Sequence, residues 1–219
     1  MAAIIGISNP AGILTGGTQS ITAEAASKPK MDKVEVCVLS SYKNQPTNQV
    51  YITFSKLSST NVTVKNLKSS NKKVVTVGKP SVSSYVKSLS IPLTFKKAGS
   101  AYISFDLKIG KKTYSYKKKV SAVKYTNPMK SFKIGKTEFA SRYKKYAGPV
   151  ILNKALSGKL KIVPNKNWKI IFMDKMTLGE GSSKVKNNTK IVLKRPSVLT
   201  VVLQNKKTGA VSSIALQIH

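Results

Sequence analysis

The sequence predicts an all-β protein composed of two tandem β-sandwich domains. Apolar and polar residues alternate with a period of two in many short segments, which is the pattern of strands with one buried face. These segments recur at intervals of roughly 8–12 residues with turn signals between them, and this spacing favours sandwiches. The length of 219 residues, less a leader, suits two domains of about 95 residues, near the usual sandwich size.

The first 27 residues differ in composition from the rest of the chain. Residues 1–27 contain no lysine or arginine, begin with the apolar run Ala2–Ile7 and end in Ala23-Glu24-Ala25-Ala26. Signal peptidase accepts a small-x-small pattern of this kind, although the apolar run is shorter than the roughly 7–15 residues of a secretory core. We therefore expect residues 1–27 to be a partial signal peptide, whose true start lies upstream, or a disordered leader.

The rest of the sequence agrees with export. No later stretch approaches the roughly 18 apolar residues that span a bilayer, so no transmembrane segment is expected. Cys37 is the one cysteine, which excludes an internal disulfide, and its alternating apolar surroundings predict that it is buried. Disulfide-free export and the lysine bias favour a secreted or cell-surface protein of a Gram-positive bacterium.

Residues 31–124 contain the clearest strand patterns. The strands expected there are Val50–Phe54, Val62–Val64, Leu89–Phe95, Ala101–Ile109 and Tyr114–Ala122. Pro92 cannot donate a hydrogen bond to a ladder, so its strand is expected at a sheet edge or to carry a bulge. The turn at Gly110 between two alternating segments predicts a hairpin.

Residues 125–219 follow the same pattern less regularly. The strands expected there are Leu160–Ile162, Trp168–Phe172, Ile191–Leu193, Val198–Leu203 and Ile214–Ile218. Only Phe139–Tyr146 has a weak helical pattern. The domain boundary is placed at Tyr125–Pro128, because Asn-Pro favours a turn and follows a completed strand.

Two motifs in the first half belong together. A Ser69-Ser70-Asn71 turn precedes a strand at Val74–Val77, and the run Lys96-Lys97-Ala98-Gly99-Ser100-Ala101-Tyr102-Ile103 enters a later strand. Serine and asparagine side chains turn the backbone through hydrogen bonds, and Gly99 can supply a positive φ before Ala101 and Ile103 point inward.

These motifs resemble the bacterial immunoglobulin-like (Ig-like) domains of group 2, which occur in tandem on secreted and surface proteins. The resemblance covers about residues 31–124. It departs from the family at Leu67, where a core tryptophan is usual, and between Val77 and Lys96, where the segment is longer. It implies a spacer, adhesive, or carbohydrate- or wall-associated module without catalysis. Residues 125–219 are assigned as a second β-sandwich from their pattern alone.

The net charge is the strongest compositional signal. The chain has 39 basic and 7 acidic residues, a formal net charge of +32. Residues 31–124 hold 18 basic and 3 acidic residues, and residues 125–219 hold 19 and 3. All basic residues except Arg142 and Arg195 are lysines, which act as point charges rather than as bidentate readers of bases or phosphates. We expect loose attraction of polyanions, or a surface that is only solubilising.

Five lysines of the predicted hairpin are candidate anion-binding residues. They are Lys108, Lys111, Lys112, Lys117 and Lys119. Alternation from Tyr114 and Tyr116 places Lys117 and Lys119 on the solvent face. The alternative is a sheet edge kept soluble by its lysines.

Trp168 is a candidate for stacking on a sugar ring. It is flanked by Asn167 and Lys169. Its place in an alternating strand favours a core role instead.

The residues that catalysis or metal binding would need are missing or scattered. The one histidine is His219 at the C-terminus, so a nucleophile has no suitable base and a zinc site has too few ligands. The acids after the leader form no glycosidase or calcium motif. The glycine- and serine-rich segment 178–183 is interpreted as a turn rather than a phosphate cradle. We expect no enzyme and no cofactor.

Three functions follow from these patterns. The leading hypothesis is a secreted or surface-associated Ig-like protein held by charge to anionic wall polymers, such as teichoic acids, or to acidic glycans. The second is non-specific binding of extracellular nucleic acid, whose affinity would fall steeply with salt. The third is a purely structural spacer.

Overall fold

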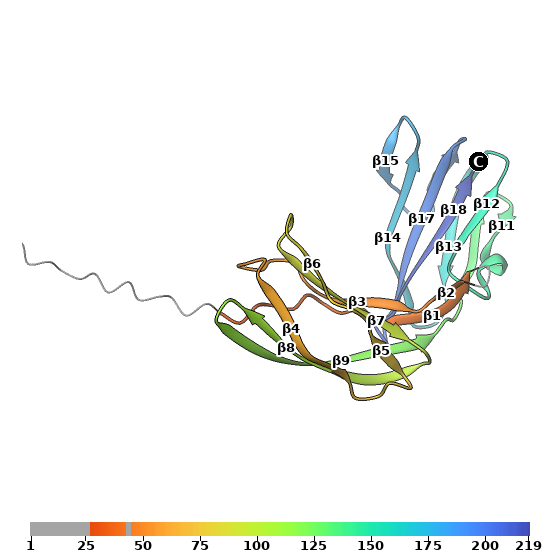
Figure 1. Ribbon diagram of the computed structural model, residues 1–219. Coiled ribbons are helices and arrows are strands. Elements are labelled where there is room, and N and C mark those ends of the chain that lie inside the picture. The colour runs from red at the N-terminus through yellow and green to blue at the C-terminus, as the bar shows by residue number, and fades with distance from the viewer. Residues whose placement is uncertain (1–26, 43–44) are drawn as a thin grey trace, which may run out of the picture.

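The structure is a computed structural model that describes residues 27–42 and 45–219, and the expected leader lies outside the described residues except for Ser27. Figure 1 shows two β-rich bodies that follow one another along the chain. Each has its own hydrophobic core, one between Cys37 and Ala122 and one between Met129 and Ile218. The predicted all-β fold of two tandem Ig-like β-sandwich domains is therefore confirmed.

The first sandwich consists of two sheets. Its strands are β1 (Cys37–Tyr42), β2 (Gln45–Thr47), β3 (Gln49–Phe54), β4 (Val62–Ser69), β5 (Val75–Val77), β6 (Ser81–Ser83), β7 (Ser88–Phe95), β8 (Gly99–Ile109) and β9 (Lys112–Lys124). One sheet has the order β2-β1-β9-β8-β4, and the other has the order β3-β7-β5 with β6 also paired to β7. Strand β1 runs parallel to β9, whereas the other pairings of this sandwich are antiparallel.

Strand β7 confirms the predicted alternation. Of the two alternatives expected for Pro92, the sheet edge is wrong, while the ladder beside it is interrupted, with residues 78–80 facing residues 91–92. The four apolar side chains of segment 89–95 at odd-numbered positions are fully buried. Strand β7 is central, with β3 on one side and β5 and β6 on the other. The Pro92 carbonyl accepts a 2.8 Å hydrogen bond from the N–H of Gly78, in the gap between β5 and β6. The missing proline N–H faces the same gap, so a central strand tolerates it here.

The turn before β5 has the side-chain hydrogen bonds expected of its composition. Ser69 Oγ accepts from the N–H of Asn71 at 3.2 Å, and Asn71 Oδ1 accepts from the N–H of Lys73 at 3.1 Å. Ser70 Oγ accepts from the N–H of Tyr102 on β8 at 2.9 Å. The turn is thus fixed to the neighbouring strand as well as to itself.

Gly99 begins β8 with the positive φ that its sequence context predicted. Its φ is +144°, and a Cβ there would lie 3.4 Å from a Val74 methyl group. Ala101 and Ile103 follow on the buried face. Glycine is favoured here because other residues seldom adopt this conformation.

The second sandwich repeats part of the strand pairing of the first. Its elements are β10 (Met129–Ile134), β11 (Thr137–Glu138), η1 (Ala140–Tyr143), β12 (Pro149–Leu152), β13 (Leu156–Pro164), β14 (Trp168–Thr177), β15 (Gly181–Lys184), β16 (Lys190–Leu193), β17 (Ser197–Asn205) and β18 (Val211–Ile218). The sheets have the orders β11-β10-β13-β16 and β12-β18-β17-β14-β15. Strand β12 runs parallel to the last strand, β18, as β1 does to β9. The two halves therefore share a strand arrangement around their last strands although their sequence motifs differ.

Strand β14 departs from simple alternation at Phe172. Continuous alternation would place Trp168, Ile170 and Phe172 on one face. The register against β17 shifts between Ile170 and Phe172, which makes Ile171 an extra residue. A bulge of this kind reverses the facing of the residues that follow it. Phe172 consequently lies opposite Val202 and is 43% exposed.

The expected helix at 139–146 is reduced to the single 3₁₀ turn η1, and the Glu138 side chain fixes its start. Glu138 Oε1 accepts hydrogen bonds from the N–H groups of Phe132, Phe139 and Ala140 at 2.8, 3.1 and 2.8 Å. Ser131 Oγ donates to Oε2 at 2.7 Å. Burial alone would raise the pKa of Glu138, but these hydrogen bonds outweigh burial and the pKa is lowered. The carboxylate is therefore a structural group.

The connection between the sandwiches is hydrogen-bonded to both. The N–H of Tyr125 donates to the Leu39 carbonyl at 3.0 Å, and Tyr125 Oη donates to the Tyr143 carbonyl at 2.7 Å. The Asn127 side chain donates to the Ala140 carbonyl at 3.0 Å. Burial raises the pKa of the Tyr125 phenol. These contacts anchor the end of β9 to both cores.

Candidate anion-binding surfaces

The five lysines selected from the sequence lie on the β8–β9 hairpin and are exposed, but they form two groups. Lys108, Lys111 and Lys112 lie near the turn at Gly110, and Lys117 and Lys119 lie further along β9. Along β9, Lys117 follows Lys112 by five residues, a length of about 17 Å. The exposure is as predicted, while binding of an anion by these lysines stays a prediction.

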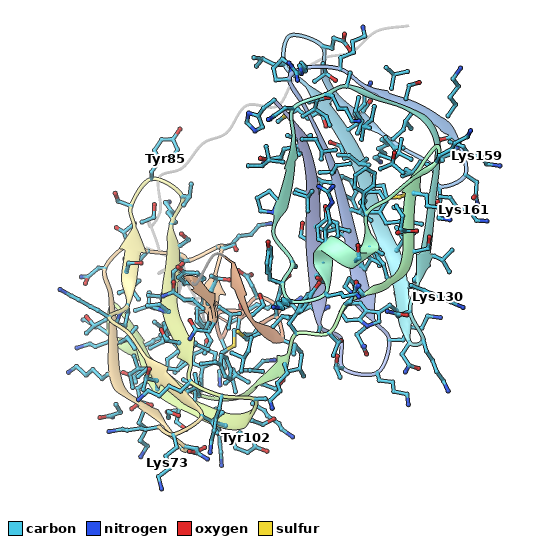
Figure 2. The ribbon with its side chains drawn as sticks, turned by 90° about the vertical axis from the view of Figure 1, so that its right-hand side faces the viewer. Lys73, Tyr85, Tyr102, Lys130, Lys159 and Lys161 are labelled. Carbon is cyan, nitrogen blue, oxygen red and sulfur yellow. The ribbon has the colours of Figure 1, made fainter. Side chains whose placement is uncertain are left out.

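Lys117 and Lys119 lie beside Tyr102 on the outward face of β8 and β9. Lys119 is directly opposite Tyr102, and Lys117 is opposite Ser104. Lys117 Nζ lies 5.0 Å from the centroid of the Tyr102 ring, within the range of a cation–π contact. Tyr102 is 43% exposed and is labelled in Figure 2. This part of the hairpin combines aromatic surface with positive charge.

Asp106 interrupts the positive charge of the hairpin. Ser115 Oγ donates to its Oδ1 and Asn66 Nδ2 to its Oδ2, both at 2.6 Å. These hydrogen bonds, Ser115 first and Asn66 second, lower the pKa of Asp106, with a smaller contribution from the charge of Lys68. The carboxylate stays ionised between the two lysine groups and divides them.

A second lysine cluster, outside the residues predicted from the sequence, lies on the outward face of β10, β13 and β16. Lys133 is directly opposite Lys161, and Lys159 is directly opposite Lys190. We call these four exposed residues the β13 lysine face. Figure 2 shows Lys159 and Lys161 on the same side of the sandwich as Lys130. Directly opposite residues have Cβ atoms about 4.5–5.5 Å apart, so like charges there oppose folding.

One acidic residue partly neutralises the β13 lysine face. Glu138 on the edge strand β11 is opposite Lys133 and offsets part of its charge, while its carboxylate is also hydrogen-bonded to the backbone. Within residues 27–42 and 45–219, the one salt bridge joins Lys194 to Glu180 at 3.1 Å. Lys159, Lys161 and Lys190 thus have no ion-pair partner in this part of the chain.

In the first sandwich, the sheet opposite the β8–β9 hairpin has no strand lysine on its outward face. The outward side chains of β3, β5 and β7 are Gln49, Tyr51, Thr53, Thr76, Ser88, Ser90, Pro92 and Thr94, with no lysine. The outward positions of β12, β17 and β18 also have no charged residue. The strand lysines of the first sandwich therefore lie on one sheet. In the second sandwich both sheets carry them, because β14 and β15 hold Lys169, Lys175 and Lys184.

Trp168 lies in the core of the second sandwich. It is 8% exposed and belongs to the buried cluster of that domain. A ring in this position presents little surface to a sugar, so the burial favours the core role that its alternating strand predicted. We do not propose Trp168 as a stacking residue.

Groups that could support catalysis are scattered in the described part of the chain. No cluster of three or more histidine, cysteine or acidic residues suited to a metal ion occurs there. Cys37 is 2% exposed, as predicted, and burial raises the pKa of its thiol to about 11. The 178–183 segment joins β14 to β15, with Glu180 engaged by Lys194. Among the described residues, no helix has the length and apolarity needed to cross a membrane.

The β13 lysine face had a visible sequence signal. Lys159 and Lys161 alternate with Leu160 and Ile162, which places both lysines on one face of a strand. The signal was incomplete, because the partners Lys133 and Lys190 come from separate strands. Only the register of β13 with β10 and β16 brings the four residues together.

No protein-family model matches the chain, and no curated protein matches it. Among solved structures, the chain is similar to domains 5-6 of the S-layer protein SbsC, with 14% identity over 88% of this chain and 97% of that one and a TM-score of 0.30. An I-band fragment of titin matches with 12% identity over 89% and 66% and a TM-score of 0.30. An endo-fucoidan hydrolase from glycoside hydrolase family 107 matches with 10% identity over 97% and 30% and a TM-score of 0.29. Likeness this weak carries no argument about function.

Proposed function

We propose that this protein is a non-enzymatic tandem Ig-like module that binds anionic polymers at a cell surface through its lysine-bearing sheet faces. Teichoic acids and acidic glycans are the polymer classes that fit this surface. An exported location is part of the proposal, supported by the signal-like residues 1–27. A relationship of the first domain to bacterial Ig-like group 2 is also proposed, and the Ser69-Ser70-Asn71 turn and Gly99 support it.

The observation that carries the proposal is the pairing of lysines across β13. A sheet gains stability when opposite residues attract and loses it when like charges face each other. Solubility alone needs no such pairs, since scattered charge on any exposed position serves as well. Two like-charge pairs on adjacent strands, Lys133–Lys161 and Lys159–Lys190, are better explained by an anion that bridges them.

A linear polymer suits the arrangement better than a small anion. Lysine-bearing faces occur on both sandwiches, so one chain of repeating charges can contact several groups of lysines at once. Each contact holds the polymer near the next one, and the combined affinity exceeds that of any single contact. Lysine ammonium groups act as point charges that tolerate many anion geometries.

The experiment compares binding of purified protein to immobilised teichoic acid at increasing salt. Wild-type protein is expected to bind at low salt. The logarithm of its binding constant should fall linearly with the logarithm of the salt concentration, since binding releases counterions. Replacing the four residues of the β13 lysine face by glutamine should weaken binding and reduce that slope. The matched control replaces four exposed loop lysines, Lys154, Lys166, Lys206 and Lys207.

Three results would contradict the proposal. Equal losses in the two quadruple variants would mean that net charge alone matters. Absence of binding at physiological salt would favour the third function, a purely structural spacer. Stronger binding of duplex DNA than of teichoic acid or heparin in competition would favour nucleic-acid binding instead.

A further inference from the structure

A hollow of about 450 Å³ lies at the open side of the second sandwich, beside the edge strands β15 and β16. Four of the residues that line it are lysines: Lys175, Lys184, Lys186 and Lys190. Ser183 and Thr189 add hydroxyl groups, and no acidic residue lines it. The hollow is therefore rich in groups that bind anions.

The segment that carries two of these lysines is held by hydrogen bonds to both sheets. The N–H of Val185 donates to the Met173 carbonyl of β14 at 3.1 Å. The Asn187 side chain accepts from the N–H of Ile162 at 2.9 Å and donates to the carbonyl of the same residue at 2.8 Å. Asn188 and Thr189 exchange 2.8 Å backbone hydrogen bonds with Leu160. Lys186 and Lys190 thus extend from a fixed backbone, which lowers the entropy cost of holding a ligand.

The residues beside the hollow cancel only part of its charge. Asp174 is opposite Lys184 across β14 and β15 and offsets part of the charge of that lysine, but it accepts a hydrogen bond from Ser182 and does not line the hollow. Lys190 belongs to the β13 lysine face as well, through its pairing with Lys159. The hollow and the β13 lysine face therefore form one continuous positive surface.

We propose that this hollow binds one repeat unit of the anionic polymer through a phosphate or sulfate ester. The inference rests on the proposed function and names the part of the polymer that is recognised. Its volume lies within the range of about 300–1,000 Å³ typical of small-molecule sites, so it can hold a sugar or polyol together with its ester group. Lysine ammonium groups and hydroxyls suit a tetrahedral oxyanion, which accepts hydrogen bonds from several directions. The rest of the polymer would continue over Lys190 and Lys159.

The test measures binding of short, defined ligands to the full chain. A glycerol phosphate oligomer and a heparin tetrasaccharide are titrated separately into isotope-labelled protein at physiological salt, and amide shifts and dissociation constants are recorded. The Lys184→Gln/Lys186→Gln variant removes two charges of the hollow and leaves the β13 lysine face unchanged. The Lys206→Gln/Lys207→Gln variant removes two exposed lysines of the β17–β18 turn. Melting followed by Trp168 fluorescence checks that both variants fold.

Wild-type protein is expected to bind the oligomer with shifts concentrated in residues 175–192. The hollow variant should bind about tenfold more weakly, since each lost charge contact weakens binding by a few-fold, and the turn variant should change little. Saturable binding of either ester supports the proposal. Equal weakening in both variants, or shifts spread over the lysines of both sandwiches, would overturn it. If long polymer binds and neither short ligand does, the hollow proposal fails and the proposed function stands. If long polymer does not bind either, both fail.

Discussion

Replacing Lys159 and Lys161 by glutamine is expected to stabilise the second domain at low salt while weakening its hold on polyanions. Both lysines lie on β13, where each is directly opposite another lysine. Glutamine retains most of the aliphatic stem and removes only the charge. The double variant therefore separates the electrostatic cost of these pairs from their packing.

The size of the gain follows from the spacing of the strands. Opposite Cβ atoms lie about 5 Å apart, and the flexible ammonium groups can move to about 8 Å from each other. At that distance in water the repulsion is about 0.5 kcal/mol per pair, or about 1 kcal/mol for the two pairs. At molar salt the screening length falls to about 3 Å, so the gain should almost vanish.

Urea unfolding followed by tryptophan fluorescence measures this change in one domain. The chain has a single tryptophan, Trp168, which is buried in the second core. A gain of about 1 kcal/mol moves the midpoint by about 0.5 M urea, given the usual slopes for domains of this size. The Lys206→Gln/Lys207→Gln variant loses the same charge without a cross-strand partner and serves as the control.

Three outcomes would refute the reasoning. The first is a double variant no more stable than wild type at low salt. The second is a gain that persists unchanged at molar salt, which would point to packing or strand propensity. The third is an equal gain in the control, which would point to net charge rather than to the pairs.

Three further predictions concern the framework that carries these surfaces. Gly158 has a φ of +151°, and a Cβ there would lie 2.6 Å from Gly135 Cα. Gly158→Ala should therefore lower the free energy of unfolding, measured in urea, by about 2–4 kcal/mol. Gly179→Ala places its Cβ in open space and should lower the free energy of unfolding by about 1 kcal/mol. Equal losses in the Gly158 and Gly179 variants would contradict the steric argument. The pKa of Glu138 is lowered in the folded state from 4.5, so its stabilisation is present above that pH and is lost as the pH falls further. Glu138→Gln should therefore reduce the fall of the urea midpoint at acid pH. An unchanged dependence of the midpoint on pH would contradict a stabilising role for the Glu138 carboxylate. Burial raises the pKa of Cys37 from 9.0 to about 11, so a thiol reagent at pH 8 should label the native chain at least about a hundredfold more slowly than the unfolded chain. Rapid native labelling would show that this part of the first core opens.

The sequence predicted features that depend on neighbouring residues in the chain. The alternation of 89–95 and 101–109, the hairpin at Gly110 and the positive φ of Gly99 are all present in the structure. Each depends on local backbone geometry, on the two-residue period of a strand or on the steric freedom of glycine, so a short segment is enough to predict it.

The incorrect expectations involved partners that are remote in sequence. Pro92 lies on a central strand because β5 and β6 leave a gap beside it, and nothing near Pro92 in the sequence indicates that gap. Phe172 turns outward because the pairing of β14 with β17 includes one extra residue. Both outcomes depend on strand register, which local alternation does not specify.

The same distinction holds for the charge. Composition alone established that the protein is strongly cationic, that lysine rather than arginine supplies the charge, and that both halves share it evenly. Tertiary structure decided where that charge is dense. Strand pairing sets Lys159 and Lys161 against Lys190 and Lys133, and the meeting of two open sheet edges produces the lysine-lined hollow. Electrostatic interactions depend on distance in space, and the fold alone brings these distant segments within reach of one another.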